Sequence, residues 1–133
     1  MNQHEMRRIA LQALYLANQE PELNYNDIVG RTTKALDLKA FPELSGSLLK
    51  GILEQKPELD EEIGNYLKSG WRIERLAQID RAILELGLYE IKNSDQIDPV
   101  AALDEALNLG EEFSSEKSKA FINGVLGNFI EEK

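Results

Sequence analysis

Cysteine is absent from this chain, and its only histidine is His4. The first absence excludes disulfides and cysteine-ligated metals, and the second excludes a histidine-based catalytic triad and a site with several histidine ligands. No apolar run approaches the roughly 20 residues that span a bilayer. Glu5, Arg7 and Arg8 interrupt the N-terminus before any apolar run typical of a secretory signal. We therefore expect a cytoplasmic chain without a membrane anchor.

Positive charge is also scarce, because 15 lysines and arginines face 24 acidic residues and give a net charge of −9. Non-specific affinity for nucleic acid comes mainly from lysine and arginine displacing counterions, so this composition argues against a strong nucleic-acid binder. A local basic patch can still bind, either weakly or with a basic partner. The hydrophobic content of 42% in 133 residues is enough for a folded core.

Apolar residues recur at helical spacing along almost the whole chain, and no segment shows sustained alternation. We predict an all-α fold of about seven helices in two small bundles, about 1–68 and 69–133, within a single domain. The expected helices cover about 3–19, a stretch capped by Asn26, a stretch from Pro42 to a break at Pro57, about 57–67, about 73–92, a stretch from Pro99, and a stretch from Ser114 or Ser115.

Three features of this helical pattern carry further expectations. Trp71 is expected to anchor the core, and Val100 is expected to join the apolar stripe of its helix. The Asn123-Gly124 pair lies inside the last helix, although glycine costs about 1 kcal/mol relative to alanine there. We expect this pair to serve close packing or a contact.

Catalytic motifs are missing from the pattern. There is no phosphate-binding loop, and Ser114-Ser115 is explained by helix capping. The acids Asp104 and Glu105 point about 100° apart on a helix, which favours a solvated face over an acid–base pair. We predict a protein that is not an enzyme and that uses no cofactor and no metal.

Two patches suit binding. Arg8, Gln12 and Tyr15 follow i, i+4, i+7 spacing on the first helix, next to Arg7. Arginine can contact phosphate, glutamine can read a base edge, and tyrosine can stack on an unpaired base. The second patch holds Lys117, Phe121 and Asn123 near the start of the expected last helix, where Lys117 and Phe121 are i, i+4 neighbours. Solvated arginines and a core position for Phe121 remain alternatives.

At these residues the sequence resembles the family of the bacterial transcription antitermination factor NusB. The matching stretches are residues 8–15 (RIALQALY), 75–90 (RLAQIDRAILELGLYE), 100–109 (VAALDEALNL) and 121–126 (FINGVL). The third resembles the family's VAINEAVELA stretch, and the fourth resembles its FVNGVL stretch. Each match is loose, but the four recur in order along nearly the whole chain.

The resemblance implies two small helical bundles and a function in transcription antitermination and termination. Members bind the boxA element of nascent RNA together with the ribosomal protein that doubles as NusE. The complex helps RNA polymerase read through terminators, notably in ribosomal RNA operons. On matching positions the RNA-binding residues would be Arg7, Arg8, Gln12, Tyr15, Lys117 and Phe121, with Asn123 beside them. The NusE-facing residues would be Glu74 and Asp80.

This chain departs from the family pattern at two places. Gln3, His4 and Glu5 precede only Arg7 and Arg8, where the family often has a run of arginines, and the family's INEA reads LDEA at 103–106. Both changes make the chain more acidic. We therefore expect weak RNA affinity for the isolated protein and cooperative binding with NusE.

Two other readings compete with an RNA-binding factor. A NusB-like module could serve only as a protein-interaction scaffold. NusB-like domains also precede ribosomal RNA cytosine methyltransferases, but we expect no methyltransferase here because the chain stops at Lys133 without room for that domain or its cysteines. A carboxylate-dependent enzyme is disfavoured. The sequence leaves open whether the protein is a monomer or a homodimer.

Overall fold

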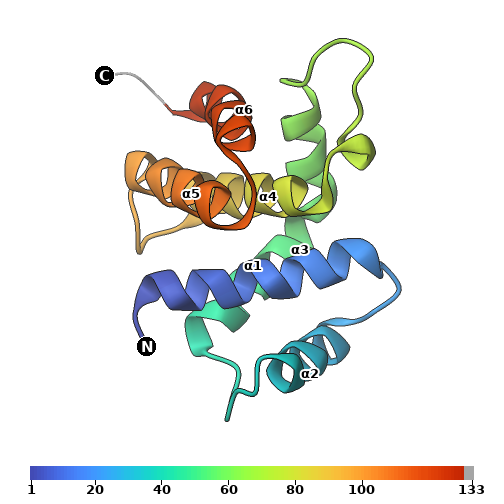
Figure 1. Cartoon of the computed structure of the whole chain (residues 1–133), viewed down its shortest axis with the longest axis vertical. Helices are drawn as coiled ribbons and strands as arrows, with labels where there is room; N and C mark the ends of the chain where they lie inside the picture. Colours follow the sequence, from blue (N-terminus) through green and yellow to red (C-terminus); the bar gives the residue numbers. More distant parts are fainter. Residues whose placement is uncertain (131–133) are drawn as a thin grey trace. The chain divides into compact units, whose positions relative to one another are not determined.

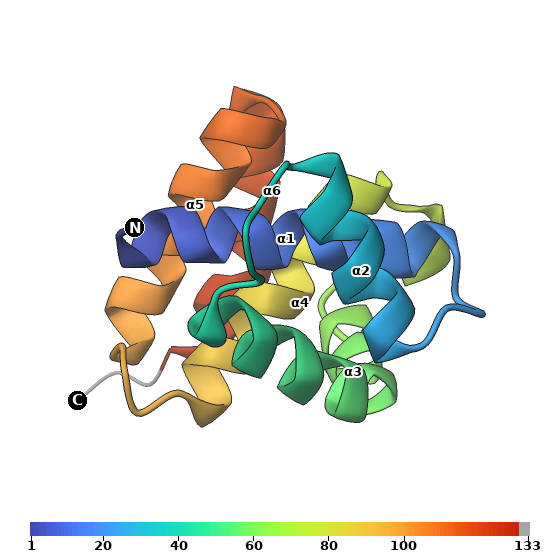
Figure 2. The same cartoon turned by 90° about the horizontal axis from the view of Figure 1, so that it is seen from below.

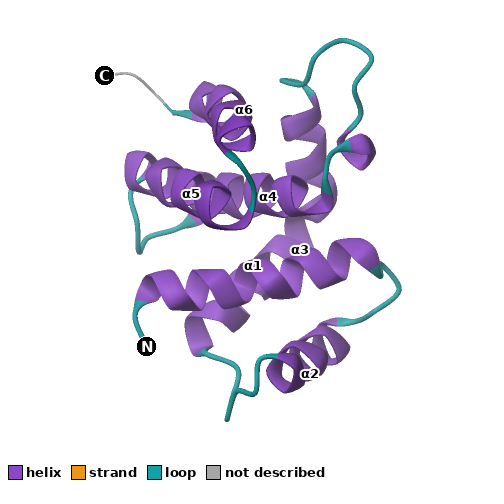
Figure 3. Ribbon diagram, in the orientation of Figure 1, coloured by secondary structure: helices purple, strands orange, loops and turns teal. Residues whose placement is uncertain are grey.

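The computed structural model describes residues 1–130, and within them it contains α-helices, two short 3-10 turns and no strand (Figure 1, Figure 3). The elements are α1 (Gln3–Gln19), α2 (Tyr25–Ala35), α3 (Glu43–Gly64), η1 (Ile73–Arg75), α4 (Gln78–Asn93), α5 (Pro99–Phe113), α6 (Glu116–Leu126) and η2 (Gly127–Phe129). The predicted all-α fold is confirmed. Residues 131–133, which end the expected second bundle, lie outside the described residues.

Polar side chains at the helix starts explain where several helices begin. Asn2 accepts a hydrogen bond from the backbone of Glu5 at 2.8 Å, and Asp98 accepts one from Ala101 at 2.9 Å, with Pro99 in the first turn. Asn24 begins α2 through a reciprocal capping box with Asp27. The expected cap at Asn26 is therefore wrong, because the acidic partner three residues downstream favours Asn24.

The chain divides into two compact units, Met1–Glu54 and Gln55–Lys133. In unit 1, α1 packs on α2, and the first part of α3 belongs to the same unit (Figure 2). The alanines and leucines of α1 form its buried face, as expected from their spacing. Ser45 on α3 ties this helix to α1 by donating to the carbonyl of Met6 at 2.6 Å.

Unit 2 is built on α4, which packs against both α5 and α6 while these two helices also pack on each other (Figure 1). Seven consecutive residues of α4, Ala82 to Leu88, are buried, in line with the central position expected from its apolar faces. Gly87 allows the close approach, because a Cβ atom there would lie 2.7 Å from Leu126 and 3.1 Å from Ala106.

Pro57 does not break the chain, and the expected helices before and after it form the single helix α3. An interior proline removes one backbone hydrogen bond and costs about 3 kcal/mol or more in isolation. Leu59 and Ile63 are fully buried just beyond it, and Lys56 pairs with Asp60 across it at 3.4 Å. The burial of Leu59 and Ile63 and the ion pair between Lys56 and Asp60 thus offset the cost of Pro57 and keep the helix continuous.

The expected helix over 73–92 is divided in the structure. Ile73–Arg75 forms the 3-10 turn η1, and α4 begins only at Gln78. Leu76 and Ala77 between them have extended backbones, with ψ of 153° and 135°. Neither residue is a glycine or a proline, so the break follows from tertiary packing, in which Ile73 is buried as an anchor.

Two large apolar side chains that were expected inside lie at the surface. Trp71 is 55% exposed and Val100 is 56% exposed. Trp71 lies in a turn between α3 and η1, and Val100 lies in the first turn of α5. At neither position does the side chain become buried in the core. Among residues 1–130, no helix combines the length and apolar character that a membrane span needs.

Candidate nucleic-acid interface

The first predicted patch lies on α1 in unit 1. Arg8 is exposed, and Gln12 and Tyr15 are half-buried, so helical geometry places all three along one partly accessible face. Gln19 extends this polar row by donating to the hydroxyl of Tyr15 at 3.1 Å. Arg7 differs, since it is 2% exposed and donates to Gln3 at 3.3 Å. Of the two arginines, Arg8 is the one presented to solvent, and direct RNA contact by Arg7 stays a prediction.

The second predicted patch lies on α6 in unit 2. Lys117 is exposed and forms no ion pair with any of residues 1–130, whereas Lys119 pairs with Glu111 at 3.1 Å. The hydrogen bond and charge of Glu111 raise the pKa of Lys119. Phe121 is half-buried, between the core and stacking positions that the sequence left open. Asn123 is exposed. Lys117 is therefore the cation that this helix offers to a ligand.

A hydrogen bond from Ser118 to Asp80 holds the start of α6 against α4. Ser115 caps α6 by accepting from the backbone of Ser118 at 3.1 Å, and the hydroxyl of Ser118 donates to Asp80 at 3.0 Å. Asp80 was expected at the NusE surface, yet it is half-buried and supports the turn that carries Lys117. The two residues are 38 positions apart, so spacing gave no signal of this contact.

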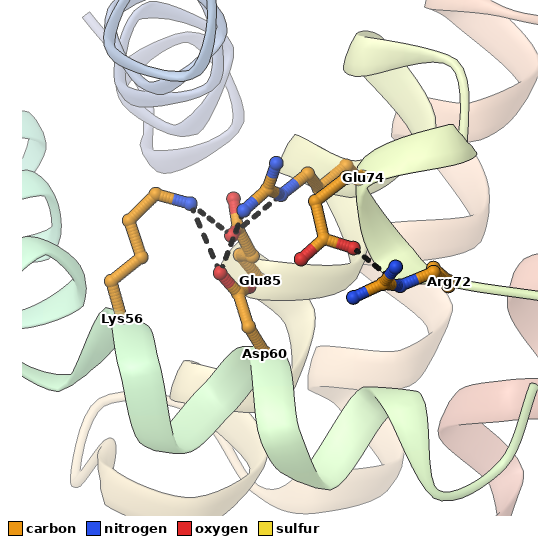
Figure 4. A network of polar contacts seen from close by, with 6 residues as sticks. Lys56, Asp60, Arg72, Glu74 and Glu85 are labelled. Carbon is orange, nitrogen blue, oxygen red and sulfur yellow. Dashed lines mark hydrogen bonds and ion pairs between the residues drawn. The ribbon is translucent and has the colours of Figure 1, made fainter. Parts of the chain in front are cut away.

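Glu74, the other residue expected at the NusE surface, is exposed in η1. Its carboxylate lies 4.0 Å from the guanidinium of Arg72, and both side chains are largely solvated (Figure 4). An exposed pair at this distance contributes little to stability. Glu74 is thus available to a partner.

The Asn123-Gly124 pair does not serve close packing within residues 1–130. Both residues are exposed, and a Cβ atom added at Gly124 would meet nothing within 4 Å. Of the two expectations stated for this pair, packing is wrong and contact with another molecule stays a prediction.

A cluster of charged residues inside unit 2, which we call the ionic cluster, consists of Lys56, Asp60, Arg81 and Glu85 (Figure 4). Arg81 donates to Asp60 at 2.8 Å and lies 3.4 Å from Glu85, while Lys56 bonds directly to Glu85. Glu85 is fully buried. Sequence reasoning missed the cluster because its members come from two helices and 21 to 29 positions separate the interhelical partners.

The two carboxyls of the ionic cluster are pushed in opposite directions. Burial first, and the proximity of Asp60 second, raise the pKa of Glu85 to about 7 against the attraction of Lys56. Burial also acts to raise the pKa of Asp60, but hydrogen bonds with Glu85 and Arg81 and the charges of Lys56 and Arg81 outweigh it, so this pKa is lowered. The cluster joins α3 to α4 and so fixes the helix that carries Asp80.

Residues 1–130 contain no group of three or more metal-ligating side chains of the His, Cys, Asp and Glu types. A hollow of about 710 Å³ in unit 1 is lined by residues of the α1–α2 connection, the start of α2 and α3, including Leu23, Tyr25, Lys50 and Leu53. None of the residues expected to bind RNA lines it. The accessible chemistry of both predicted patches is that of cations, amides and aromatic rings.

Comparison with known proteins identifies the family. The model of the NusB family matches residues 4–131. The chain belongs to the NusB family. Among its relatives, the transcription antitermination protein NusB of Limosilactobacillus reuteri is 39% identical, covering 97% of this chain and 93% of the relative. NusB of Levilactobacillus brevis is 34% identical, covering 100% and 95%. The expected family resemblance is confirmed, and membership supports the expectation that the chain is not an enzyme.

Solved structures share the NusB fold. The structure of T. maritima NusB superposes with a TM-score of 0.82 at 23% identity, covering 97% of this chain and 90% of that chain. NusB from a crystal structure of antitermination factors NusB and NusE with double-stranded RNA gives 0.79 at 24% identity, covering 97% of both chains. A chain in the crystal structure of a plectonemic RNA supercoil gives 0.80 at 26% identity, covering 96% and 94%. Because the first two structures are less than 25% identical to this chain, their similarity shows a shared fold and nothing more.

Proposed function

We propose that this protein acts in transcription antitermination by binding boxA-type RNA together with the ribosomal protein NusE in the cytoplasm. Its relatives are named transcription antitermination protein NusB, and a chain of the same fold has been crystallised with NusE and double-stranded RNA. The complex would support read-through by RNA polymerase, notably in ribosomal RNA operons. The chain would act as one RNA-binding domain to which each unit contributes a patch.

One observation on this chain carries the RNA-binding part of the proposal. Lys117, exposed and without an ion pair among residues 1–130, shares the first turns of α6 with the half-buried ring of Phe121. The residues are four apart, so they are neighbours on the helix surface. A cation beside an accessible ring suits an unpaired nucleotide, whose phosphate and base need those two contacts.

The net charge explains why a partner is part of the proposal. With −9 overall, the chain repels RNA at long range, and its two patches supply few cations. A basic partner that binds the exposed acidic side chains of unit 2, such as Glu74, would remove part of this repulsion. RNA and NusE would then bind cooperatively.

Fluorescence anisotropy of a labelled boxA-like RNA, measured with and without NusE over a salt series, tests this proposal. We expect the affinity to rise with NusE and to fall with salt. Tight binding by the protein alone at physiological salt, unchanged by NusE, contradicts the cooperative part. If RNA does not bind under either condition while NusE still does, the protein is a protein-interaction scaffold.

Matched variants separate RNA contact from folding. Lys117→Ala should weaken RNA binding, whereas Lys119→Ala, on the same helix but paired with Glu111, should change it less. Arg8→Ala should also weaken binding, with Arg31→Ala, which removes an exposed arginine paired with Glu20, as its control. Circular dichroism and NusE binding should be unchanged in all four variants.

Phe121→Ala tests the stacking role of the ring. We expect RNA affinity to fall by about 5-fold or more while helicity persists. Unfolding of this variant would mean that Phe121 is a core residue and would remove its RNA role. Asp80→Ala should lower RNA affinity as well, because it releases Ser118 at the start of α6.

A further inference from the structure

The segment Lys68–Arg75, which we call the Trp71 loop, contains a hydrogen-bonded turn that presents an exposed aromatic ring. The backbone N–H of Trp71 donates to the carbonyl of Lys68 at 2.9 Å, and Gly70 between them has a φ of +87°. This is the pattern of a type II turn, in which glycine adopts the positive φ of the third position. The ends of such a turn lie about 7 Å apart or closer. The backbones of Lys68 and Trp71 are therefore held together.

Contacts on both sides fix the loop to unit 2. Before it, Tyr66 packs edge-on against Phe129 of η2, with ring centroids 5.0 Å apart. After it, the buried side chain of Ile73 anchors η1, in which Arg75 donates its backbone N–H to Arg72 at 2.9 Å. Figure 1 shows the connection projecting beyond the end of α3. Trp71 is thus exposed on a segment that is anchored on both sides.

Charge in the Trp71 loop has the opposite sign to that of the whole chain. The loop holds three cations, Lys68, Arg72 and Arg75, and one carboxylate, Glu74, whereas acidic residues outnumber basic ones 24 to 15 overall. All four side chains are exposed. Lys68 and Arg75 form no ion pair with any of residues 1–130, and Arg72 has only the 4.0 Å contact with Glu74. These charges do not stabilise the fold.

We propose that the Trp71 loop is a second contact for single-stranded RNA, in which a base stacks on Trp71 and adjoining phosphates bind Lys68, Arg72 and Arg75. The inference rests on the proposed RNA-binding function and adds a site on a connection that neither predicted RNA-binding patch includes, although Glu74 within it is expected to face NusE. Alternating rings and cations are how proteins bind unpaired strands without reading their sequence.

Single-stranded RNA fits this surface better than a protein partner does. Tryptophan and arginine are common in protein interfaces as well, but lysine is depleted there. The excess of three exposed cations over one carboxylate matches the repeated phosphates of an RNA strand, each of which needs a positive charge. A duplex also fits poorly, because its bases are stacked inside and cannot reach an exposed indole.

Trp71 is the only tryptophan, so its fluorescence reports on this site alone. We would titrate the full chain, with and without NusE, with unlabelled boxA-like RNA and with the same RNA annealed to its complement. The single strand should quench Trp71 and the duplex should quench it much less. Binding of labelled RNA, followed by anisotropy, gives the affinity independently.

Variants of the ring and its cations complete the test. Trp71→Ala should weaken single-strand binding about 10-fold, and Trp71→Phe should restore part of the loss. Val100→Ala, which trims another exposed apolar side chain of unit 2, should have no effect. Lys68→Ala and Arg75→Ala should each lower the salt slope of binding by about 0.7. NusE affinity should not change.

Each contrary outcome has a separate meaning. If RNA binds but Trp71 fluorescence and the affinity of Trp71→Ala are unchanged, this inference is wrong and the proposed function stands. If Trp71→Ala loses NusE affinity and keeps RNA affinity, the Trp71 loop is a protein interface and the inference is again wrong. If wild-type protein binds no RNA with or without NusE, the proposed function fails and the inference fails with it.

Discussion

The ionic cluster and the Trp71 loop both concentrate charge in unit 2, but they use it differently. In the ionic cluster, two carboxylates and two cations meet within 3.4 Å or less, and Glu85 is fully buried. In the Trp71 loop, three cations stand in solvent, and the single carboxylate makes only a solvated 4.0 Å contact with Arg72. Charges that are paired inside hold helices together, whereas solvated charges at the surface contribute little to stability and can attract a ligand.

Breaking the ionic cluster should have the largest effect on stability. Lys56→Ala removes one of the two cations beside the buried carboxylate of Glu85, and breaking a buried pair costs about 3 kcal/mol in the free energy of unfolding. Urea denaturation at neutral pH measures this. Lys50→Ala, which removes an exposed lysine from the same helix, should change stability by less than about 0.5 kcal/mol. Equal effects of the two substitutions would refute a stabilising role for the cluster.

Titration of the ionic cluster sharpens the comparison. The folded-state pKa of Glu85, about 7, lies above its ordinary value of 4.5, so folding favours the protonated carboxyl. Its contribution to stability is complete below about pH 4.5 and is lost as the pH rises through about 7. The lowered pKa of Asp60 acts oppositely, since its contribution is present above 3.8 and is lost as the pH falls.

Glu85→Gln keeps the shape of the side chain and removes its titration. We expect a smaller fall in the urea midpoint between pH 5 and pH 8 than in the wild-type protein. The loss of stability at acid pH that comes from protonation of Asp60 should remain. Superimposable pH profiles for the two proteins would contradict the raised pKa of Glu85. Arg72→Ala, outside the ionic cluster, serves as the control because it should leave the profile unchanged.

Two glycines repeat the contrast between interior and surface. Gly87→Ala should cost about 2 kcal/mol, because its Cβ atom would lie 2.7 Å from Leu126 in the packed core. Gly124→Ala should instead stabilise the fold by about 1 kcal/mol, since its Cβ atom meets nothing and alanine favours a helix. Thermal denaturation of both variants tests the signs. A loss of RNA or NusE binding in stable Gly124→Ala would reveal a contact at this face.

The smallest change in stability is expected in the Trp71 loop. Arg72→Ala removes an exposed pair at 4.0 Å and should alter the free energy of unfolding by less than about 0.5 kcal/mol. RNA affinity should nevertheless fall, with a shallower salt dependence. A destabilisation comparable with that of Lys56→Ala would show that the charges of the Trp71 loop stabilise the fold, and would contradict the contrast with the ionic cluster.

Sequence alone predicted the parts of this fold that depend on neighbours in the chain. The span of α1, the start at Pro99 and the start near Ser114 or Ser115 follow from apolar spacing and capping residues, and the structure confirms them, with Ser115 as the cap of α6. Continuity through Pro57, the break before Gln78 and the exposure of Trp71 depend on tertiary packing. Local propensity contains no information about such packing.

The candidate site divides in the same way. Helical spacing and family resemblance placed Arg8 and Lys117 on accessible faces, where the structure finds them, whereas Phe121 is half-buried between the core and stacking positions that the sequence left open. Their RNA roles stay predictions. The bond between Ser118 and Asp80 joins positions 38 apart and could not be read from spacing. The burial of Arg7, next to exposed Arg8, depends on the tertiary neighbours of α1.

The continuity of α3 bears on how the protein denatures. The helix runs from Glu43 to Gly64, so the boundary between the two units after Glu54 falls inside a helix rather than in a linker. Pro57 leaves the carbonyl of Leu53 without its usual amide donor beside this boundary. A protease therefore finds no extended segment to cut there while α3 is intact. The chain can therefore be divided at this boundary only after α3 itself has melted.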